Sequence, residues 1–277
     1  MTQEALSPAG SRSYPLGTHE FVRSLGVPDL GPHTSPFDPG YDVVTVVSHL
    51  DQSGHLMSRL KISMACWLIA SETATLEKVA AARRLEVPLV TGGGPFEIAQ
   101  DRGKLDEFLE LVASLGIDRV EAGEGFTSLR HQPVDVVRKA ERMGLEVQAE
   151  LGEKHGGDFT ATGVEKVAQA GLRWLDAGAV QVVIEARESA AHVGLFDAGG
   201  EIDFGGAELL VQTLGMERVV FEAPTKKSQF DFLQHFGSAV NLGNVRLEEL
   251  LRVEIYRRGL HSDAYGRDLA ARPRNSG

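Results

Sequence analysis

Residues 177–189 read AGAVQVVIEARES: a turn that carries a glycine, a run of apolar β-branched residues, and a glutamate where the run ends. Similar phrases occur at 119–123 (RVEAG), 145–151 (LEVQAEL) and 218–224 (RVVFEAP). The runs are almost continuously apolar, which is typical of parallel strands that are buried on both faces. They predict a parallel β-sheet whose strands recur along the chain.

Eight such segments predict strands, at Val43–Val47, Leu60–Met64, Val87–Val90, Arg119–Glu121, Leu145–Ala149, Val180–Ile184, Arg218–Phe221 and Ala239–Asn241. Helical patterns alternate with them, at Thr75–Leu85, Lys104–Leu115, Val134–Met143, Val164–Ala177, Ala207–Leu214, Ser228–Phe236 and Arg246–Arg258. Eight strands with helices between them in about 230 residues match an α/β protein with a (β/α)8 TIM barrel. Periodicity alone leaves a doubly wound open sheet as the alternative.

The predicted barrel covers residues 41–266, and we expect different structure outside it. Residues 1–40 are rich in glycine, proline and serine, which predicts a flexible or loosely packed segment with a short helix over 18–27 and a loop over 28–40. Residues 267–277 form a polar tail. Few residues separate Val47 from Leu60, too few for a crossover helix, so we expect either an abridged first βα unit or a first strand that lies elsewhere.

Composition limits the classes of partner. The chain has 28 Lys and Arg against 39 Asp and Glu, a formal charge of −11, which argues against nucleic-acid and anionic-membrane surfaces. The N-terminus has no apolar signal region, and a single cysteine, Cys66, excludes an internal disulfide. We expect a soluble cytoplasmic protein that binds a small anionic molecule and self-associates into a homo-oligomer.

Four consecutive predicted strands end in a glutamate: Glu121, Glu150, Glu185 and Glu222. The carboxyl ends of parallel barrel strands meet at one mouth, so these side chains should converge there. Converging carboxylates repel one another unless cations or protons neutralise them. Lys61, Lys154 and Arg187 are expected at the same mouth as catalytic residues. The alternative is a salt-bridge network that only stiffens the barrel.

The chemistry of these groups indicates Mg²⁺, which prefers oxygen ligands, and we predict Glu150, Glu185 and Glu222 as its ligands. Glu121 is expected to bind substrate. Three glycines, Gly92 to Gly94, follow the third predicted strand and either cradle an anion with Gly92 and Gly93 amides or form a tight turn. Asn241 and Asn244 follow the last strand, where barrels often bind phosphate, and are predicted to bind substrate.

Taken in order, the strand-end phrases resemble the phosphosulfolactate synthase family. The matching stretches are TGGGPFEIA (91–99), ELGEKH (150–155), AGAVQVVIEARES (177–189), FEAPTKKSQ (221–229), FGSAVNLGNV (236–245) and RRGLHSDAYG (257–266). The resemblance implies a (β/α)8 barrel that adds sulfite to the double bond of phosphoenolpyruvate with the help of Mg²⁺. It implies that Lys61 ends the second strand, that Lys154 acts as general acid, and that further motif positions are Glu97, Glu150, Glu185, Arg187, Glu188, Glu222 and Asn241.

The chain also departs from the family pattern. The family's Asp-Lys-Gly at the end of strand one is expected near Val47, where this chain reads Ser48-His49-Leu50. Its Gly-Trp-Gly-Thr after the strand-two lysine is replaced by Ile62-Ser63-Met64-Ala65. Glu153 and His261 replace a lysine and an arginine of other motifs. Positive charges that would hold a polyanionic substrate are therefore missing.

Two hypotheses about the function follow, one for an enzyme and one for a protein without catalytic activity. The first is a lyase-type enzyme that adds sulfite, or another nucleophile, to phosphoenolpyruvate or a related enolpyruvyl acid; a different substrate in a specialised biosynthetic pathway is an open variant. The second is a non-catalytic barrel related to plant heat-stress proteins, which the altered strand-one motif would fit.

Overall fold

The structure is a computed structural model that describes residues 17–152, 157–267 and 269. The chain divides into two compact units, residues 1–30 and 31–277. In the described part of the first unit, α1 covers Thr18–Ser24, which confirms the short helix expected over 18–27. Most of the polar tail predicted for 267–277 lies outside the described residues.

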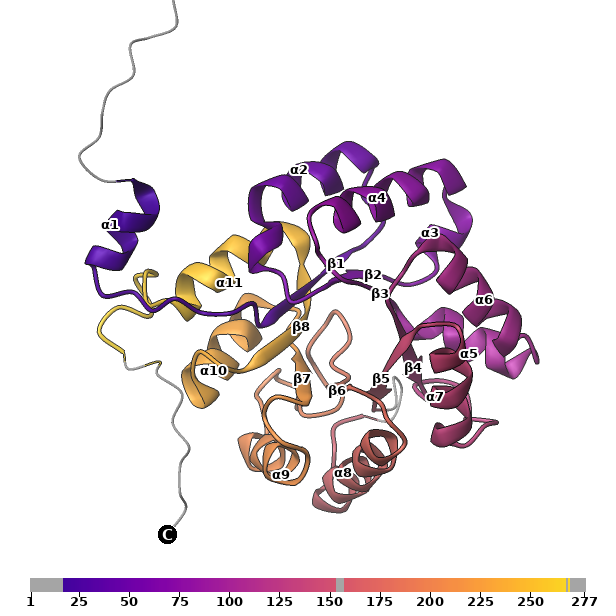
Figure 1. The fold of residues 1–277 in the computed structure, drawn as a ribbon. Coiled ribbons are helices and arrows are strands. Elements are labelled where there is room, and N and C mark those ends of the chain that lie inside the picture. Colours follow the sequence, from indigo (N-terminus) through magenta and orange to yellow (C-terminus); the bar gives the residue numbers. More distant parts are fainter. Residues whose placement is uncertain (1–16, 153–156, 268, 270–277) are drawn as a thin grey trace, which may run out of the picture. The chain divides into compact units, whose positions relative to one another are not determined.

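The second unit is a closed barrel of parallel strands (Figure 1). Each strand pairs with its neighbour in the sequence, and the last pairs with the first. The strands are β1 (Thr34–Asp38), β2 (Leu60–Ile62), β3 (Leu89–Thr91), β4 (Arg119–Gly123), β5 (Glu146–Leu151), β6 (Gln181–Ile184), β7 (Val219–Glu222) and β8 (Asn241–Arg246). The predicted (β/α)8 barrel is confirmed, and the open sheet is wrong.

Helices surround the barrel and alternate with its strands (Figure 1). They are α2 (Val43–Ser53), α3 (Cys66–Ile69), α4 (Glu72–Arg84), α5 (Gly93–Asp101), α6 (Leu105–Leu115), α7 (Pro133–Arg142), α8 (Ala161–Asp176), α9 (Phe204–Leu214), α10 (Lys226–Phe236) and α11 (Leu250–Arg257). Two 3₁₀ turns, η1 (Gly54–Leu56) and η2 (Leu247–Glu249), precede β2 and α11. In the described residues, no helix combines the length and the apolar character that crossing a membrane requires.

The first strand is not where the sequence pattern places it. Residues 43–47, predicted as strand one, begin helix α2, whose first turn is capped by the Asp42 carboxylate accepting from the Thr45 N–H at 3.0 Å. Val46 and Leu50, four residues apart, form the buried face of this helix. Strand β1 lies within the predicted loop instead, so the first βα unit is complete. The alternative of a first strand that lies elsewhere is confirmed, and the abridged unit is wrong.

Proline explains why β1 escapes prediction. Pro36 lies in the middle of the strand, a position that normally argues against a strand because proline lacks an N–H. The pairing of β1 with β8 shifts register between Thr34 and Pro36, so the proline lies at an irregularity of the ladder. The strand then ends at Asp38-Pro39-Gly40, not at Ser48-His49-Leu50. The comparison of the family's Asp-Lys-Gly motif with Ser48-His49-Leu50 is therefore wrong, because these residues lie within helix α2 and not at the end of a strand.

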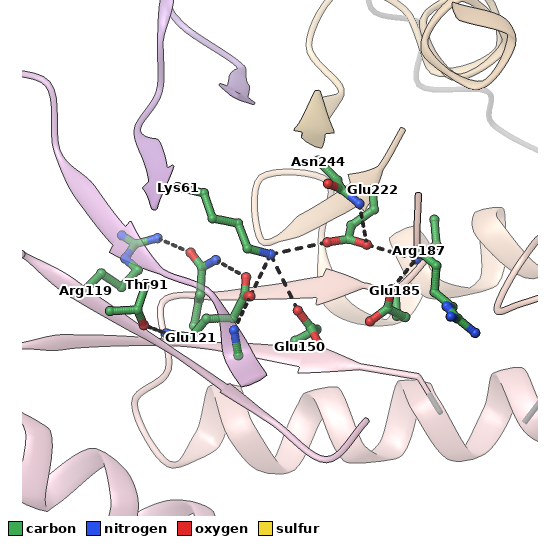
Figure 2. A network of polar contacts seen from close by, with 12 residues as sticks. Lys61, Thr91, Arg119, Glu121, Glu150, Glu185, Arg187, Glu222 and Asn244 are labelled. Carbon is green, nitrogen blue, oxygen red and sulfur yellow. Dashed lines mark hydrogen bonds and ion pairs between the residues drawn. The ribbon is translucent and has the colours of Figure 1, made fainter. Parts of the chain in front are cut away.

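The inside of the barrel carries charged and polar side chains, whereas the outside of its strands is apolar. Along β4, Val120 and Ala122 are fully buried in the hydrophobic core between the strands and the helices. Arg119 and Glu121 alternate with them and form polar contacts inside the barrel (Figure 2). The hydrophobic core between strands and helices thus stabilises the barrel, and the charged network lies inside it.

Candidate active site

A buried lysine lies at the centre of the charged network. The Lys61 Nζ, from β2, lies 2.6 Å from Glu121 Oε1, 3.3 Å from Glu222 Oε1 and 3.5 Å from Glu150 Oε2 (Figure 2). The three carboxylates come from β4, β7 and β5, so strands far apart in the sequence meet at one ammonium. The predicted convergence of glutamates around Lys61 is confirmed for these three.

Lys61 remains protonated in this setting. Burial alone would lower the pKa of the Lys61 ammonium, but the surrounding carboxylates outweigh it and the pKa lies well above its ordinary value. A charged lysine can donate a proton or bind an anion, but it cannot act as a base.

Glu121 is held by several donors. Its Oε1 accepts from the Gly93 N–H at 2.9 Å as well as from Lys61, and its Oε2 accepts from Gln148 Nε2 at 2.8 Å. Arg119 in turn donates to Gln148 Oε1 at 3.2 Å, which orients the Gln148 amide so that its NH₂ group faces Glu121. Burial, together with the nearby Glu150 carboxylate, raises the pKa of Glu121 to about 8 despite the attraction of Lys61. Near neutral pH the three carboxylates around the Lys61 ammonium therefore share one bound proton in addition to those of the ammonium.

Glu222 is also fixed on both oxygens. Its Oε1 contacts Lys61, and its Oε2 accepts from the Ala186 N–H at 3.0 Å and from Asn244 Nδ2 at 3.3 Å. Burial raises the pKa of Glu222, with Glu150 and Glu121 adding to the rise. Asn244 therefore orients a carboxylate of the site and also lines the cavity described below.

Glu185 and Arg187 follow β6 at the mouth. The Arg187 N–H donates to Glu185 Oε1 at 2.6 Å, and Arg187 adopts a left-handed backbone with φ of 52°. This conformation is uncommon for a residue with a side chain and is typical of functional loops. Both residues line the same cavity as Lys61.

The cavity has a volume of about 590 Å³. Its described lining carries four carboxylates and two cations, together with an apolar side. The lining residues are Lys61, Ser63, Met64, Ala65, Gly92, Gly93, Gly94, Pro95, Ile98, Phe126, Glu150, Glu185, Arg187, Glu188, Ser189, Glu222 and Asn244. This size suits a small molecule with several functional groups.

The glycine run forms the amino end of α5 rather than an anion cradle. The Gly92 N–H donates to the Ile62 carbonyl at 3.1 Å, and the Gly93 N–H is taken by Glu121. The predicted substrate binding by these two amides does not fit, although both residues line the cavity. A Cβ on Gly92 would lie 2.8 Å from Met64 N, and one on Gly93 3.3 Å from Glu150 Oε1. The tight-turn alternative is therefore favoured, because close packing here requires glycine.

Two predicted site residues do not line the cavity. Asn241 begins β8, at the opposite end of the barrel, and its Nδ2 donates to the backbone carbonyls of Met216 and Val219 at 3.0 and 3.2 Å. It cannot bind a substrate at the mouth, and the prediction is wrong because strand eight begins where we expected it to end. Glu121 is fully buried and is not among the residues that line the cavity, so its predicted binding of substrate stays a prediction. Lys154 lies outside the described residues.

Sequence reasoning missed other residues of the site. Gln148 could have been found, since it stands two positions before Glu150 on β5 and strand alternation places both inside the barrel. Met64, Ile98 and Phe126 also line the cavity, with apolar side chains. Met64 was predicted to end the second strand but lies beyond β2, whereas Ile98 and Phe126 come from a helix and a loop that the pattern did not predict.

The predicted magnesium site would need the carboxylates of Glu150, Glu185 and Glu222 to converge on one ion. No group of three or more His, Cys, Asp or Glu side chains in the described parts of the chain is arranged to hold a metal ion. Both oxygens of Glu222 already accept protein hydrogen bonds. Glu222 therefore does not fit as a ligand. Glu150 and Glu185 line the cavity and could supply one or two of the oxygens that Mg²⁺ takes from protein when substrate and water complete its shell.

Comparisons with known proteins give consistent matches. The family model described as (2R)-phospho-3-sulfolactate synthase matches residues 32–263. The phosphosulfolactate synthase of Methanocaldococcus jannaschii is 30% identical over 235 residues, which cover 84% of this chain and 94% of that protein. The one from Methanothermobacter thermautotrophicus is 29% identical over 246 residues, 87% of this chain and 94% of that protein.

Solved structures agree on the fold. The 3-dehydroquinate dehydratase of Geobacillus kaustophilus matches with a TM-score of 0.54 and 13% identity, over 82% of this chain and 91% of that one. At this identity the likeness concerns the barrel fold alone.

Proposed function

Because the chain belongs to the phosphosulfolactate synthase family, a family of carbon–sulfur lyase-type enzymes, we propose that it adds sulfite, or another nucleophile, to phosphoenolpyruvate or a related enolpyruvyl acid. The observation that carries this proposal is the Lys61 ammonium, which lines the cavity while three carboxylates hold it within 3.5 Å. A positioned acid that is protonated before the reaction is what the second half of such an addition requires.

Binding would use the cations of the cavity. The carboxylate and phosphate of the substrate would face Lys61 and Arg187, because both line the cavity and carry positive charge. The amino end of α5, at Gly93 and Gly94, adds the partial positive charge of a helix N-terminus. Asn244 supplies an amide beside them.

The chemical step would proceed by attack and protonation. The lone pair of the nucleophile forms a bond to C3, and the π electrons move toward C2 and its carboxylate. Lys61 then donates its proton to C2, which completes the addition without any oxidant or leaving group. The extra proton held by the carboxylate cluster around Lys61 restores its charge for the next turnover.

Mg²⁺ would support the same reaction. We propose that Glu150 and Glu185 hold it together with oxygens of the substrate. When bound, the ion stabilises negative charge that develops on the substrate carboxylate.

The earlier prediction that Lys154 acts as general acid stays a prediction. If it is the acid in place of Lys61, Lys154→Ala should lower kcat by roughly 10²–10⁴-fold, which is the usual contribution of a positioned proton donor. Steady-state kinetics measures this, and a near-normal kcat removes Lys154 from the mechanism.

The proposed function itself is tested by mixing the protein with phosphoenolpyruvate and sulfite and following the ultraviolet absorbance of the enol double bond. We expect a decrease that requires both sulfite and protein. No decrease at stoichiometric protein, with and without Mg²⁺, would contradict sulfite addition to phosphoenolpyruvate and favour a different substrate or a non-catalytic barrel.

A further inference from the structure

The cavity has two chemically different sides. Lys61, Glu150, Glu185, Glu222 and Asn244 bring charge and polarity from β2 and from β5 to β8. The other side is formed by five apolar residues that we call the apolar wall: Met64, Ala65, Pro95, Ile98 and Phe126. These come from the segments after β2, β3 and β4, which are neighbouring strands of the barrel. The apolar wall is therefore one continuous sector of the mouth.

The largest side chains of the apolar wall are only half covered. Met64, Ile98 and Phe126 are 52%, 51% and 47% exposed. Contiguous apolar surface that is rimmed by polar groups marks a binding site more often than a scattered exposed side chain does. The protein itself leaves this surface open beside the charged groups.

The apolar wall is held in place by specific contacts. Glu97, fully buried on α5, accepts through Oε2 from the Phe126 N–H at 2.9 Å, the Thr127 N–H at 2.8 Å and the Thr127 hydroxyl at 3.1 Å. Gln100, one turn further along, accepts from the Arg130 N–H at 2.8 Å and donates to the Ser128 carbonyl at 3.0 Å. The loop that carries Phe126 is thus fixed to the helix that carries Ile98.

The Met64 side of the apolar wall is equally constrained. Met64 has a left-handed backbone with φ of 52°, and its N–H lies so close to Gly92 that a Cβ there would be 2.8 Å from the nitrogen. A non-glycine residue in this conformation carries backbone strain that the surroundings must hold. Ser63, Met64 and Ala65 also stand where the chain departs from the family's Gly-Trp-Gly-Thr motif. The departure thus falls on the lining of the cavity.

Phosphoenolpyruvate and sulfite have almost no apolar surface that could pack against the apolar wall. Their phosphate, carboxylate and sulfite oxygens are more stable next to charged groups or water. We propose that the enolpyruvyl substrate of this chain carries an apolar substituent of several carbon atoms, which packs against the apolar wall while the carboxylate and phosphate face Lys61 and Arg187. The inference rests on the proposed function and specifies its substrate class.

Binding of unreactive saturated analogues tests the inference without requiring turnover. The probes are 2-phospholactate and its homologue with a butyl group on C3, measured by titration calorimetry. Each methylene buried against the wall should tighten binding about fourfold. We expect the homologue to bind the wild-type protein about tenfold or more tighter than 2-phospholactate.

Two variants show whether the tighter binding of the homologue comes from the apolar wall. Ile98→Gln and Phe126→Ala should each remove most of the preference for the homologue and leave the affinity for 2-phospholactate nearly unchanged. Leu76→Gln is the matched control, because Leu76 is an apolar helix residue, 43% exposed, that does not line the cavity. It should retain the full preference.

The inference is overturned if the homologue binds no tighter than 2-phospholactate, or if neither analogue binds. It is also overturned if Ile98→Gln dissociates an oligomer in sedimentation while the wild type shows no alkyl preference, since a second copy of the chain would then cover the wall. The absorbance assay reports on the proposed function separately. Turnover of phosphoenolpyruvate without any alkyl preference would reject the inference alone.

Discussion

At the scale of single residues, the site is organised by an excess of negative charge around one buried cation. Glu121, Glu150 and Glu222 share the Lys61 ammonium, and the pKa values of Glu121 and Glu222 rise because burial and mutual repulsion disfavour ionisation. The strand-end pattern in the sequence predicted that these groups meet. It did not predict which would face substrate, because that depends on whether a strand ends at Glu121 or two residues later, at Gly123.

Glu121→Gln tests the raised pKa through stability. The pKa of Glu121 is raised to about 8 in the folded protein, so the stabilising effect of its bound proton is complete below the ordinary pKa of 4.5 and is lost as the pH rises toward 8. Glutamine cannot lose that proton. Between pH 5 and pH 9 the variant should therefore lose less stability than the wild type, by roughly 1–3 kcal/mol. Urea unfolding at the two pH values measures the difference, and Glu107→Gln, on the surface of α6, should follow the wild type. A larger loss in Glu121→Gln than in the wild type would contradict the raised pKa.

Lys61→Met tests the proposed proton donor. Removing the ammonium should lower kcat by roughly 10²–10⁴-fold, the range of a positioned general acid. Lys78→Met is the control, since the Lys78 side chain is only 12% exposed and lies 2.6 Å from Asp38 Oδ2, but does not line the cavity. Its kcat per folded molecule should stay within about threefold of the wild type, a threshold well inside the effect of losing a general acid. Equal losses in the two variants, measured by steady-state kinetics, would show that Lys61 acts only through folding.

At the scale of elements, the largest prediction errors occurred where glycine and proline hide regular structure. Helix α5 begins in a glycine run followed by Pro95, and β1 contains Pro36, so both read as loop. Proline is in fact compatible with the first turn of a helix and with an irregular ladder. By contrast, α6 and α7, with clear apolar faces, were predicted to within a few residues. Local sequence patterns do not predict a helix or strand whose formation depends on tertiary contacts.

Gly92→Ala tests the packing of α5 against the segment after β2. The new Cβ would lie 2.8 Å from Met64 N, a backbone atom that cannot move aside cheaply. We expect a loss of about 1–3 kcal/mol in the free energy of unfolding, as for other overpacked sites. Gly94→Ala is the control: its Cβ would meet nothing closer than Phe126 Cε1 at 3.9 Å, and stability should be unchanged or slightly higher. Urea unfolding distinguishes the two, and equal stability of both variants would contradict the close approach.

At the scale of the whole molecule, the barrel could be predicted because seven of the eight predicted runs overlap a barrel strand and parallel strands must bury both faces. The two-sided cavity could not, since Met64, Ile98 and Phe126 reach it from segments with no shared period. The expected homo-oligomer likewise stays a prediction, which sedimentation measures directly. The chain has the barrel fold and belongs to the family, and its cavity has a charged side and an apolar side.

Magnesium binding is tested on the intact protein. In the presence of phosphoenolpyruvate, millimolar Mg²⁺ should raise the Tm by roughly 2–4 °C, because a ligand held by the folded state alone stabilises it by about 1 kcal/mol or more. Glu185→Gln should abolish the rise, and NaCl at equal ionic strength should not reproduce it. An unchanged Tm in the wild type would contradict the proposed ion.

The account depends most on Lys61 delivering a proton to C2 of an enolpyruvyl acid inside the charged cavity. The direct measurement is the reaction of phosphoenolpyruvate with sulfite in deuterium oxide, with the product followed by ³¹P nuclear magnetic resonance and mass spectrometry. The account predicts a phosphorylated sulfonate with one deuterium at C2, formed by the wild type and by Lys78→Met and nearly absent with Lys61→Met. Product formation at the wild-type rate in Lys61→Met would contradict it.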